Sequence, residues 1–203
     1  MDVRQLNPGV DGTVAGDLLR VQRAAYAVEA ALIGDDRIPT LWESLDELRA
    51  APLRWLGAFT PSGEPPVPAG GEPPVPAGGE PPVPAGTDSR VGPPDTVPAR
   101  PYEPAGRLVG AVAWTEDATT LDIDRLVVDP AAHRRGVGRA LVGALLTRAG
   151  DRTVLVATGR ANRPARALYE SFGFTALGDA EPVPGLWITR YALPGRAAAT
   201  RSA

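Results

Sequence analysis

A perfect triple repeat limits most strongly how this chain can fold. The unit Gly-Glu-Pro-Pro-Val-Pro-Ala-Gly occurs three times in succession over residues 63–86, and 15 of the 23 prolines lie within residues 61–106. Proline lacks a backbone N–H and fixes φ, so this stretch cannot supply a sheet ladder or a packed core. We therefore predict a single domain over residues 1–203, interrupted by a low-complexity loop insert over 61–106, with a disordered tail over 195–203.

Four of the remaining segments have the apolar spacing or the capping residues of α-helices. In the first, apolar residues recur every three or four positions until Gly34. The second opens with the capping box Ser44-Leu-Asp-Glu47. The fourth has Asn162 as its cap. The expected helices are Asp17–Ile33, a short helix from Ser44 that ends before Pro52, a third from about Arg139 to Ala149, and a fourth between Asn162 and Gly173.

Five apolar or β-branched segments predict strands. They are Arg54–Phe59, Leu108–Trp114, Thr119–Val128, Thr153–Thr158 and Leu186–Leu193. The first two flank the predicted insert, and we expect them to pair as a hairpin with a long tip, because closure entropy grows only logarithmically with loop length. The order of helices and strands predicts an α/β fold with a mixed sheet and helices on both faces.

Between the third strand and the third helix lies a segment with the residues of a phosphate-binding loop, His133-Arg-Arg-Gly-Val-Gly-Arg139. Its glycines let the backbone approach a ligand, the helix beyond offers unpaired N–H groups, and the arginines add positive charge. The dinucleotide fingerprint does not fit because position 141 is leucine, and the Walker loop does not fit because the chain has no lysine. The alternative interpretation is a tight strand-to-helix turn with solvated arginines.

Two motifs in this region resemble those of the GNAT acetyltransferase superfamily. Leu126–Pro130 followed by His133–Leu141 is similar to the acetyl-CoA motif Gln/Arg-x-x-Gly-x-Gly/Ala. Its first position falls on His133, which departs from the family pattern, although Arg135-x-x-Gly138-x-Ala140 has the same spacing. The second motif is Asn162, Ala167-Leu-Tyr169 and Phe172-Gly-Phe174. The resemblance covers residues 108–174 and implies a GNAT-like acyl-CoA N-acyltransferase fold with a splayed central strand pair.

The resemblance also implies an activity and a co-substrate. It predicts an N-acetyltransferase that moves an acetyl group from acetyl-CoA directly to a bound amine, without a metal. Family members bind the pantetheine arm along the strand before the loop and the pyrophosphate on the loop itself. The residues that this pattern assigns to acetyl-CoA are Leu126, Val127, Val128, Arg134, Arg135, Gly136, Val137, Gly138, Arg139, Ala140 and Asn162.

Tyr169 is the residue that the resemblance implies as the acid for the departing thiolate. A tyrosine with an ordinary pKa of ~10 is protonated at neutral pH and can donate. Without the motif, Tyr169 would be interpreted as a core residue. For the base we name Asp124 and Glu29, with Asp122 as a further candidate on the same strand face as Asp124; each is equally interpretable as a solvated carboxylate.

The remaining aromatic residues and the single histidine give weaker indications. We interpret Trp42, Trp55 and Trp114 as core residues rather than walls of the acceptor pocket, although Trp42 lies where the family that the chain resembles builds its acceptor site. We interpret His133 as a residue on the phosphate side or in solvent. Family members that acetylate protein N-termini commonly carry a glutamate five residues before the motif asparagine, where this chain has Ala157. This departure favours a small-molecule amine over a protein N-terminus as acceptor.

Composition excludes several other functions. The chain has no cysteine and no lysine, so it can form neither a disulfide nor a lysine Schiff base. The net charge of −3 argues against a nucleic-acid partner, and no apolar run approaches the roughly 20 residues that span a bilayer. We expect a cytoplasmic enzyme, with a homodimer as the candidate assembly. The alternatives are a catalytically silent CoA-binding regulator and an interaction protein that uses the proline-rich repeats.

Overall fold

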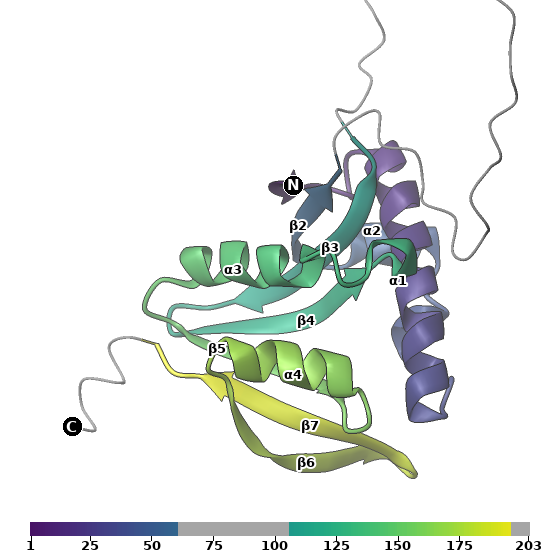
Figure 1. The fold of residues 1–203 in the computed structure, drawn as a ribbon. Coiled ribbons are helices and arrows are strands. Elements are labelled where there is room, and N and C mark those ends of the chain that lie inside the picture. The colour runs from purple at the N-terminus through teal and green to yellow at the C-terminus, as the bar shows by residue number, and fades with distance from the viewer. Residues whose placement is uncertain (61–105, 196–203) are drawn as a thin grey trace, which may run out of the picture.

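The computed structural model describes residues 1–60 and 106–195, so residues 61–105 and 196–203, which hold most of the predicted insert and tail, lie outside the described residues. Within the described part, seven strands form one mixed sheet in the order β1-β2-β3-β4-β5-β7-β6 (Figure 1). The strands are β1 (Asp2–Leu6), β2 (Arg54–Phe59), β3 (Leu108–Glu116), β4 (Thr120–Val128), β5 (Thr153–Gly159), β6 (Thr175–Val183) and β7 (Leu186–Leu193). The helices are α1 (Gly12–Ile33), α2 (Leu45–Ala50), α3 (Val137–Ala149) and α4 (Arg163–Ser171), with short 3-10 turns η1 (Pro39–Leu41) and η2 (Pro130–Ala132).

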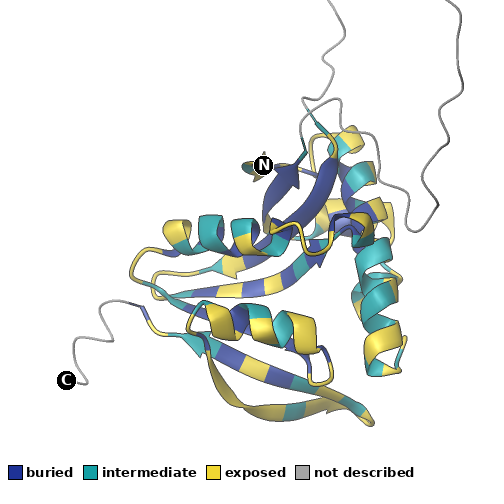
Figure 2. Cartoon of the chain, in the orientation of Figure 1, coloured by how far each residue is buried: buried dark blue, intermediate teal, exposed yellow. Residues whose placement is uncertain are grey.

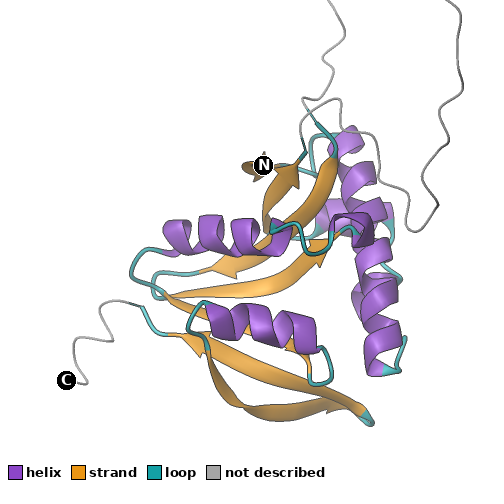
Figure 3. Cartoon of the chain, in the orientation of Figure 1, coloured by secondary structure: helices purple, strands orange, loops and turns teal. Residues whose placement is uncertain are grey.

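A hydrophobic core lies on each face of this sheet, as the predicted α/β architecture requires; Figure 3 shows the helices and strands that enclose these cores. On one face, α3 and α4 pack against the strands, and on the other face α1 and α2 do so. Neighbouring residues of β3 point into opposite cores: Val112 packs beneath α3, whereas Ala111 and Ala113 pack beneath α1. Strands β2 and β3 are therefore buried along most of their length, whereas β6 is exposed (Figure 2).

All four predicted helices are present, but α1 begins at Gly12, five residues earlier than predicted. Asp11 caps it, because its carboxylate accepts hydrogen bonds from the N–H groups of Thr13 and Val14. At the other end Gly34 takes the left-handed conformation, with φ of 70°, and ends the helix as predicted. No helix in residues 1–60 and 106–195 is long and apolar enough to cross a bilayer.

Two edge strands, β1 and β6, extend the sheet beyond the five predicted strands. β1 pairs antiparallel with β2 and has only five residues. β6 pairs antiparallel with β7, but all except one of its residues are exposed, so it shows no apolar alternation. Gly178 and Pro182 further weaken the strand signal in the sequence of β6, since both residues are unfavourable inside a strand.

Trp42 is not a core residue, contrary to the prediction. Its side chain is 70% exposed, and its indole Nε1 donates a hydrogen bond to the carbonyl oxygen of Asp36. Trp55 and Trp114 are buried as predicted, one on each face of the sheet.

The strands that flank residues 61–105 pair as predicted. β2 and β3 are antiparallel, with Arg54 opposite Trp114 and Phe59 opposite Leu108. Just beyond this ladder, the N–H of Thr60 donates to the carbonyl oxygen of Arg107 at 3.0 Å. The chain therefore leaves and re-enters the described domain at neighbouring points.

The sheet splays between β4 and β5, and this opening positions the candidate site. The two strands are parallel and pair only from Thr120 opposite Thr153 to Ile123 opposite Val156. At the same point the register between β3 and β4 shifts by one residue, which leaves Asp124 as the extra residue of a bulge. Beyond the bulge, Leu126–Val128 pairs with β3 alone.

Candidate active site

Two cavities lie where β4 and β5 diverge. The first, the loop-side cavity, has a volume of about 560 Å³ and is bounded by α1, the end of β4, the start of α3 and the start of α4. The second, the strand-side cavity, has a volume of about 320 Å³ and lies between α1, β4, β5 and β7. Five residues line both cavities and form the junction between them: Tyr26, Glu29, Leu126, Asn162 and Ala165.

The segment between η2 and α3 gives the loop-side cavity a cationic end. Arg134 and Gly136 both have positive φ, 60° and 81°. A non-glycine residue in this conformation costs of order 1 kcal/mol, so the surrounding structure must hold Arg134 in place. The first turn of α3, which begins at Val137, presents backbone N–H groups that have no partner within a helix. Together with the guanidinium groups of Arg134 and Arg139, which line the cavity, these N–H groups can bind a phosphate.

Most of the residues predicted to bind acetyl-CoA line the loop-side cavity. Arg135 and Ala140 belong to the same loop and helix but do not line it. The predicted residues that do line it are Leu126, Val127, Val128, Arg134, Gly136, Val137, Gly138, Arg139 and Asn162.

Gly138 keeps space open at the start of α3. A Cβ added there would lie 3.2 Å from Cδ2 of Leu168, which lines the same cavity. Asn162 closes the far side by capping α4, since its side-chain oxygen accepts from the N–H of Ala165 at 3.2 Å. The second predicted motif therefore contributes to the cavity through a helix cap.

The edge of β4 that faces the opening is unpaired over Leu126–Val128 within the described sheet. Backbone N–H and C=O groups along such an edge can pair with an extended ligand as an added strand does. His133 lines the loop-side cavity at the end of this edge, and its Nε2 lies 3.3 Å from the carbonyl oxygen of Val128.

Tyr169 lines the strand-side cavity and is only 3% exposed. Its ring packs against Phe174 and Tyr191, with centroids 5.6 Å and 6.2 Å away. Its hydroxyl group has no hydrogen-bond partner among the described residues, and burial raises the pKa of this phenol above its ordinary value. Tyr169 is therefore protonated at neutral pH, with a donor that is free to act in the cavity.

Glu29 and Asp124, the two predicted base candidates, both line the strand-side cavity, whereas Asp122 does not. Glu29 has no hydrogen-bond or ion-pair partner within residues 1–60 and 106–195. One oxygen of Asp124 accepts from Nε of Arg125 at 2.6 Å. Burial, followed by the negative charge of Asp124, raises the pKa of Asp122.

Arg125 and Tyr26 are site residues that the sequence analysis did not identify. Arg125 is 7% exposed, lines the strand-side cavity and forms ion pairs with Glu43 and Asp124. The signal for Arg125 was its place between Ile123 and Val127, where the alternation along the strand predicts an apolar residue. Tyr26 lines both cavities one helical turn before Glu29, and the i, i+3 spacing of these two residues was its signal.

A separate network behind the strand-side cavity fixes Arg125. Its Nη1 donates to Glu43 at 2.7 Å and to Gln22 at 3.1 Å, and Gln22 in turn donates to Glu43 and to the carbonyl oxygen of Thr40. These contacts connect α1, η1 and β4. Glu43 in this network and Asp124 at Nε together neutralise the buried guanidinium.

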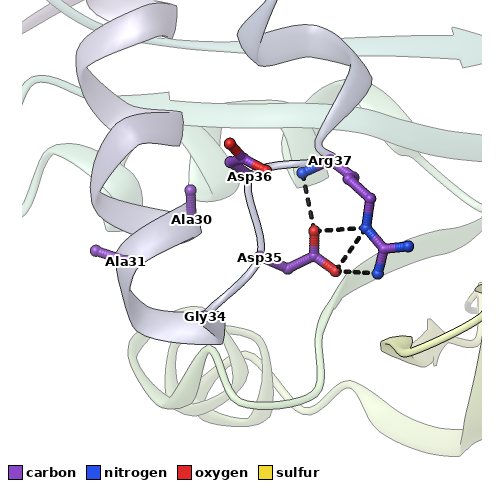
Figure 4. A pocket seen from close by; sticks show the side chains of 6 residues that line it. All are labelled: Ala30, Ala31, Gly34, Asp35, Asp36 and Arg37. Carbon is purple, nitrogen blue, oxygen red and sulfur yellow. Dashed lines mark hydrogen bonds and ion pairs between the residues drawn. The ribbon is translucent and has the colours of Figure 1, made fainter.

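A third, shallow pocket lies at the end of α1 and shares no lining residue with either cavity (Figure 4). Within it, the Arg37 guanidinium bonded to Asp35 lowers the pKa of that carboxyl to about 2. Arg37 also donates to the carbonyl oxygen of Pro184 at 3.0 Å, which connects the end of α1 to the β6–β7 turn.

Across the described ranges, no group of three or more histidine or carboxylate side chains is placed to hold a metal ion.

Comparisons with known proteins give one family model and several relatives. Residues 76–174 match the model of the acetyltransferase (GNAT) family. UPF0157 protein YqkA of Bacillus subtilis is 26% identical over 184 residues, which cover 90% of this chain and 41% of that protein. Mycothiol acetyltransferase of Beutenbergia cavernae is 49% identical over 63 residues, which cover 29% of this chain and 21% of that protein. The chain thus spans less than half the length of these curated relatives.

A solved structure shows the same fold. PaiA N-acetyltransferase from Thermoplasma acidophilum, determined in complex with coenzyme A, superposes with a TM-score of 0.54 at 13% identity. The superposition covers 94% of this chain and 98% of that one.

Proposed function

Because residues 76–174 match the model of the acetyltransferase (GNAT) family, we propose that this chain is a GNAT acetyltransferase and that it transfers an acetyl group from acetyl-CoA to the amino group of an acceptor. The observation that carries the proposal is the junction of the two cavities at Tyr26, Glu29 and Asn162. A donor held in the loop-side cavity and an acceptor held in the strand-side cavity would meet there. Positioning two reactants in this way can supply much of the rate enhancement.

We assign acetyl-CoA to the loop-side cavity because its chemistry matches the parts of that molecule. The cationic end, with Arg134, Arg139 and the first turn of α3, suits the pyrophosphate. The unpaired edge of Leu126–Val128 suits the amide groups of the pantetheine arm. Bound acetyl-CoA supplies the activated acyl group, and the chain supplies the remaining chemistry.

In the proposed reaction, Glu29 or Asp124 first accepts a proton from the acceptor's ammonium group. The free amine nitrogen then forms a bond to the thioester carbon, and the bond from this carbon to sulfur breaks. Tyr169 donates its proton to the departing sulfur and regains one from the acetylated nitrogen. The proton taken by the carboxylate leaves to solvent, so that the products are an amide, CoA thiol and one proton.

We favour a small-molecule amine as the acceptor. Ala157 lines the strand-side cavity at the position where family members that modify protein N-termini commonly carry a glutamate. The carboxylates that remain there, Glu29 and Asp124, come from α1 and from the β4 bulge.

The test combines calorimetric titration with acetyl-CoA and a thiol-release assay over a panel of amines, using the wild type and Tyr169→Phe. The variant should bind acetyl-CoA normally but turn over about 10²-fold more slowly, a typical loss for a general acid. The KM of the acceptor should change little, because the hydroxyl acts mainly in the transition state.

Tyr191→Phe is the matched control. Tyr191 belongs to the same buried cluster and touches Tyr169, but it lines neither cavity, and its hydroxyl bonds to Arg166 and Glu170. This control should turn over at close to the wild-type rate. Equal turnover of wild type and Tyr169→Phe would contradict the acid role, and binding of acetyl-CoA without turnover of any amine would favour the regulator.

A further inference from the structure

One part of the strand-side cavity is apolar. Its walls come from the end of α1, from η1 and from the β6–β7 hairpin. The apolar residues on these walls are Ile33, Ile38, Pro39, Pro182, Leu186 and Ile188. A ligand that fills this space must therefore present an apolar body to it.

The charges in the lining are few and unequal. Among the described residues that line the cavity, the only charged side chains are Glu29, Asp124 and Arg125. Arg125 is already committed, at 2.7 Å to Glu43 and at 2.6 Å to Asp124. Glu29 and Asp124 together with Arg125 give the described lining a net charge of −1, and it contains no cation that is not already paired.

Two polar groups that line the cavity have no partner among the described residues and can bind a ligand. Glu29 has no partner among the described residues, and one of its oxygens lies close to Gly159, 3.4 Å from where a Cβ would stand. Tyr169 is 3% exposed and lines the cavity, and its hydroxyl group is likewise without a partner in the described part of the chain. An ammonium group can pair with Glu29 beside this hydroxyl, while the rest of the acceptor extends along the apolar walls.

On the function proposed above, we infer that the acceptor is a monoamine with an apolar body and without a negatively charged group. A carboxylate on the acceptor would leave water for a space that already carries negative charge and offers it no free cation, which is unfavourable. A second ammonium that lay against the apolar walls named above would leave water, with no carboxylate among those wall residues to pair with it.

Three amines of equal length test this inference: pentylamine, 1,5-diaminopentane and 5-aminopentanoate. They share the reacting group and differ only in the far end, which is apolar, cationic or anionic. We expect kcat/KM to fall in that order, with pentylamine exceeding 5-aminopentanoate by about tenfold or more. A kcat/KM for 5-aminopentanoate or for the diamine equal to or above that for pentylamine would overturn the inference.

A variant that adds the missing cation sharpens the test. Leu186 lines only the strand-side cavity, so Leu186→Arg should leave the affinity for acetyl-CoA unchanged. It should also reduce the preference for pentylamine over 5-aminopentanoate by about tenfold, because the acid gains a counter-charge. Leu186→Gln, which adds polarity without charge, should leave that preference close to the wild-type value. An equal change in both variants would overturn the electrostatic part of the inference.

Failure of the inference can be distinguished from failure of the proposed function. Thiol release from none of the amines would contradict the proposed function, and the inference would then be decided by calorimetric titration of the three amines onto protein saturated with CoA. The same order of affinities would support it, and preferred binding of 5-aminopentanoate would contradict it. Turnover of 5-aminopentanoate in preference to pentylamine would contradict the inference alone.

Discussion

Replacing Gly136 by alanine would measure how much free energy a non-glycine residue costs in the left-handed backbone conformation at the start of α3. Gly136 has φ of 81° and ψ of 7°, in the left-handed region that non-glycine residues avoid. A Cβ built there meets no heavy atom within 4 Å, so the substitution adds no crowding. The cost is therefore conformational, about 1–2 kcal/mol of the free energy of unfolding. For a domain of this size that corresponds to a Tm lower by about 3–6 °C.

Two further variants separate conformation from crowding. Gly136→Asn should cost about half as much as Gly136→Ala, because asparagine adopts the left-handed conformation more readily although it is larger. Gly138 has no positive φ, but a Cβ there would lie 3.2 Å from the flexible end of Leu168. Gly138→Ala should keep the free energy of unfolding within about 0.5 kcal/mol, because alanine's helix propensity offsets the contact. Its affinity for acetyl-CoA should nevertheless fall by about tenfold, because the added methyl occupies the loop-side cavity.

Urea titration of the wild type and the three variants, with calorimetric titration of acetyl-CoA beside it, provides both measurements. The free energy of unfolding should be lowest for Gly136→Ala, and acetyl-CoA should bind more weakly to Gly138→Ala. If Gly136→Asn were less stable than Gly136→Ala, size rather than conformation would set the cost, and the reasoning would be refuted.

Two more variants test the support of the loop and the predicted insert. Asp129, 6% exposed, accepts from Arg20 at 3.1 Å and from Arg107 at 2.8 Å; although burial opposes this, the Ala131 N–H and the two guanidinium groups hold its pKa below the usual range. The contribution of Asp129 to stability is thus fully present above the unfolded pKa of ~3.9 and is lost as pH falls through the lower folded pKa. The free energy of unfolding from urea titrations between pH 5 and 2 should therefore depend less on pH for Asp129→Asn than for the wild type. An equal pH dependence would contradict the assignment. Deleting residues 63–86 should lower Tm by less than about 3 °C, because Thr60 and Arg107 are already hydrogen-bonded neighbours, and a drop of about 10 °C in thermal denaturation would show that the repeats stabilise the domain.

The elements that the sequence predicted well are those whose signals are local. The capping box at Ser44, the asparagine cap at Asn162 and the glycine stop at Gly34 each act within one helical turn, and the structure has helix ends at all three. The two residues that line the junction from α1 were predicted unevenly, since the family resemblance drew attention to Glu29 but not to Tyr26. Residue type alone does not show which residues on a helix face a cavity.

The bulge at Asp124 shows why the rest of the site could not be predicted. Alternation along the strand placed Asp122 and Asp124 on one face as equivalent candidates. The one-residue shift against β3 leaves only Asp124 in the cavity lining and directs Arg125 toward Gln22 and Glu43. A bulge depends on the register between two strands, which a single sequence does not specify. The contacts that make Arg125 part of the site, 82 and 103 residues away along the chain, are equally non-local.

The opening between β4 and β5 has a consequence for the protein in the cell as well as for its chemistry. Four residue pairs join these strands, fewer than at any other junction of the described sheet. On the proposed function, bound acetyl-CoA would pair with the unpaired edge of β4, so the donor would also contribute to the stability of the folded sheet. A ligand that binds only the folded state stabilises it by about 2.7 kcal/mol at a concentration of 100 times its Kd. The stability of this protein, and with it its lifetime, would then rise and fall with the concentration of acetyl-CoA, so that its abundance would vary with the supply of activated acetyl groups.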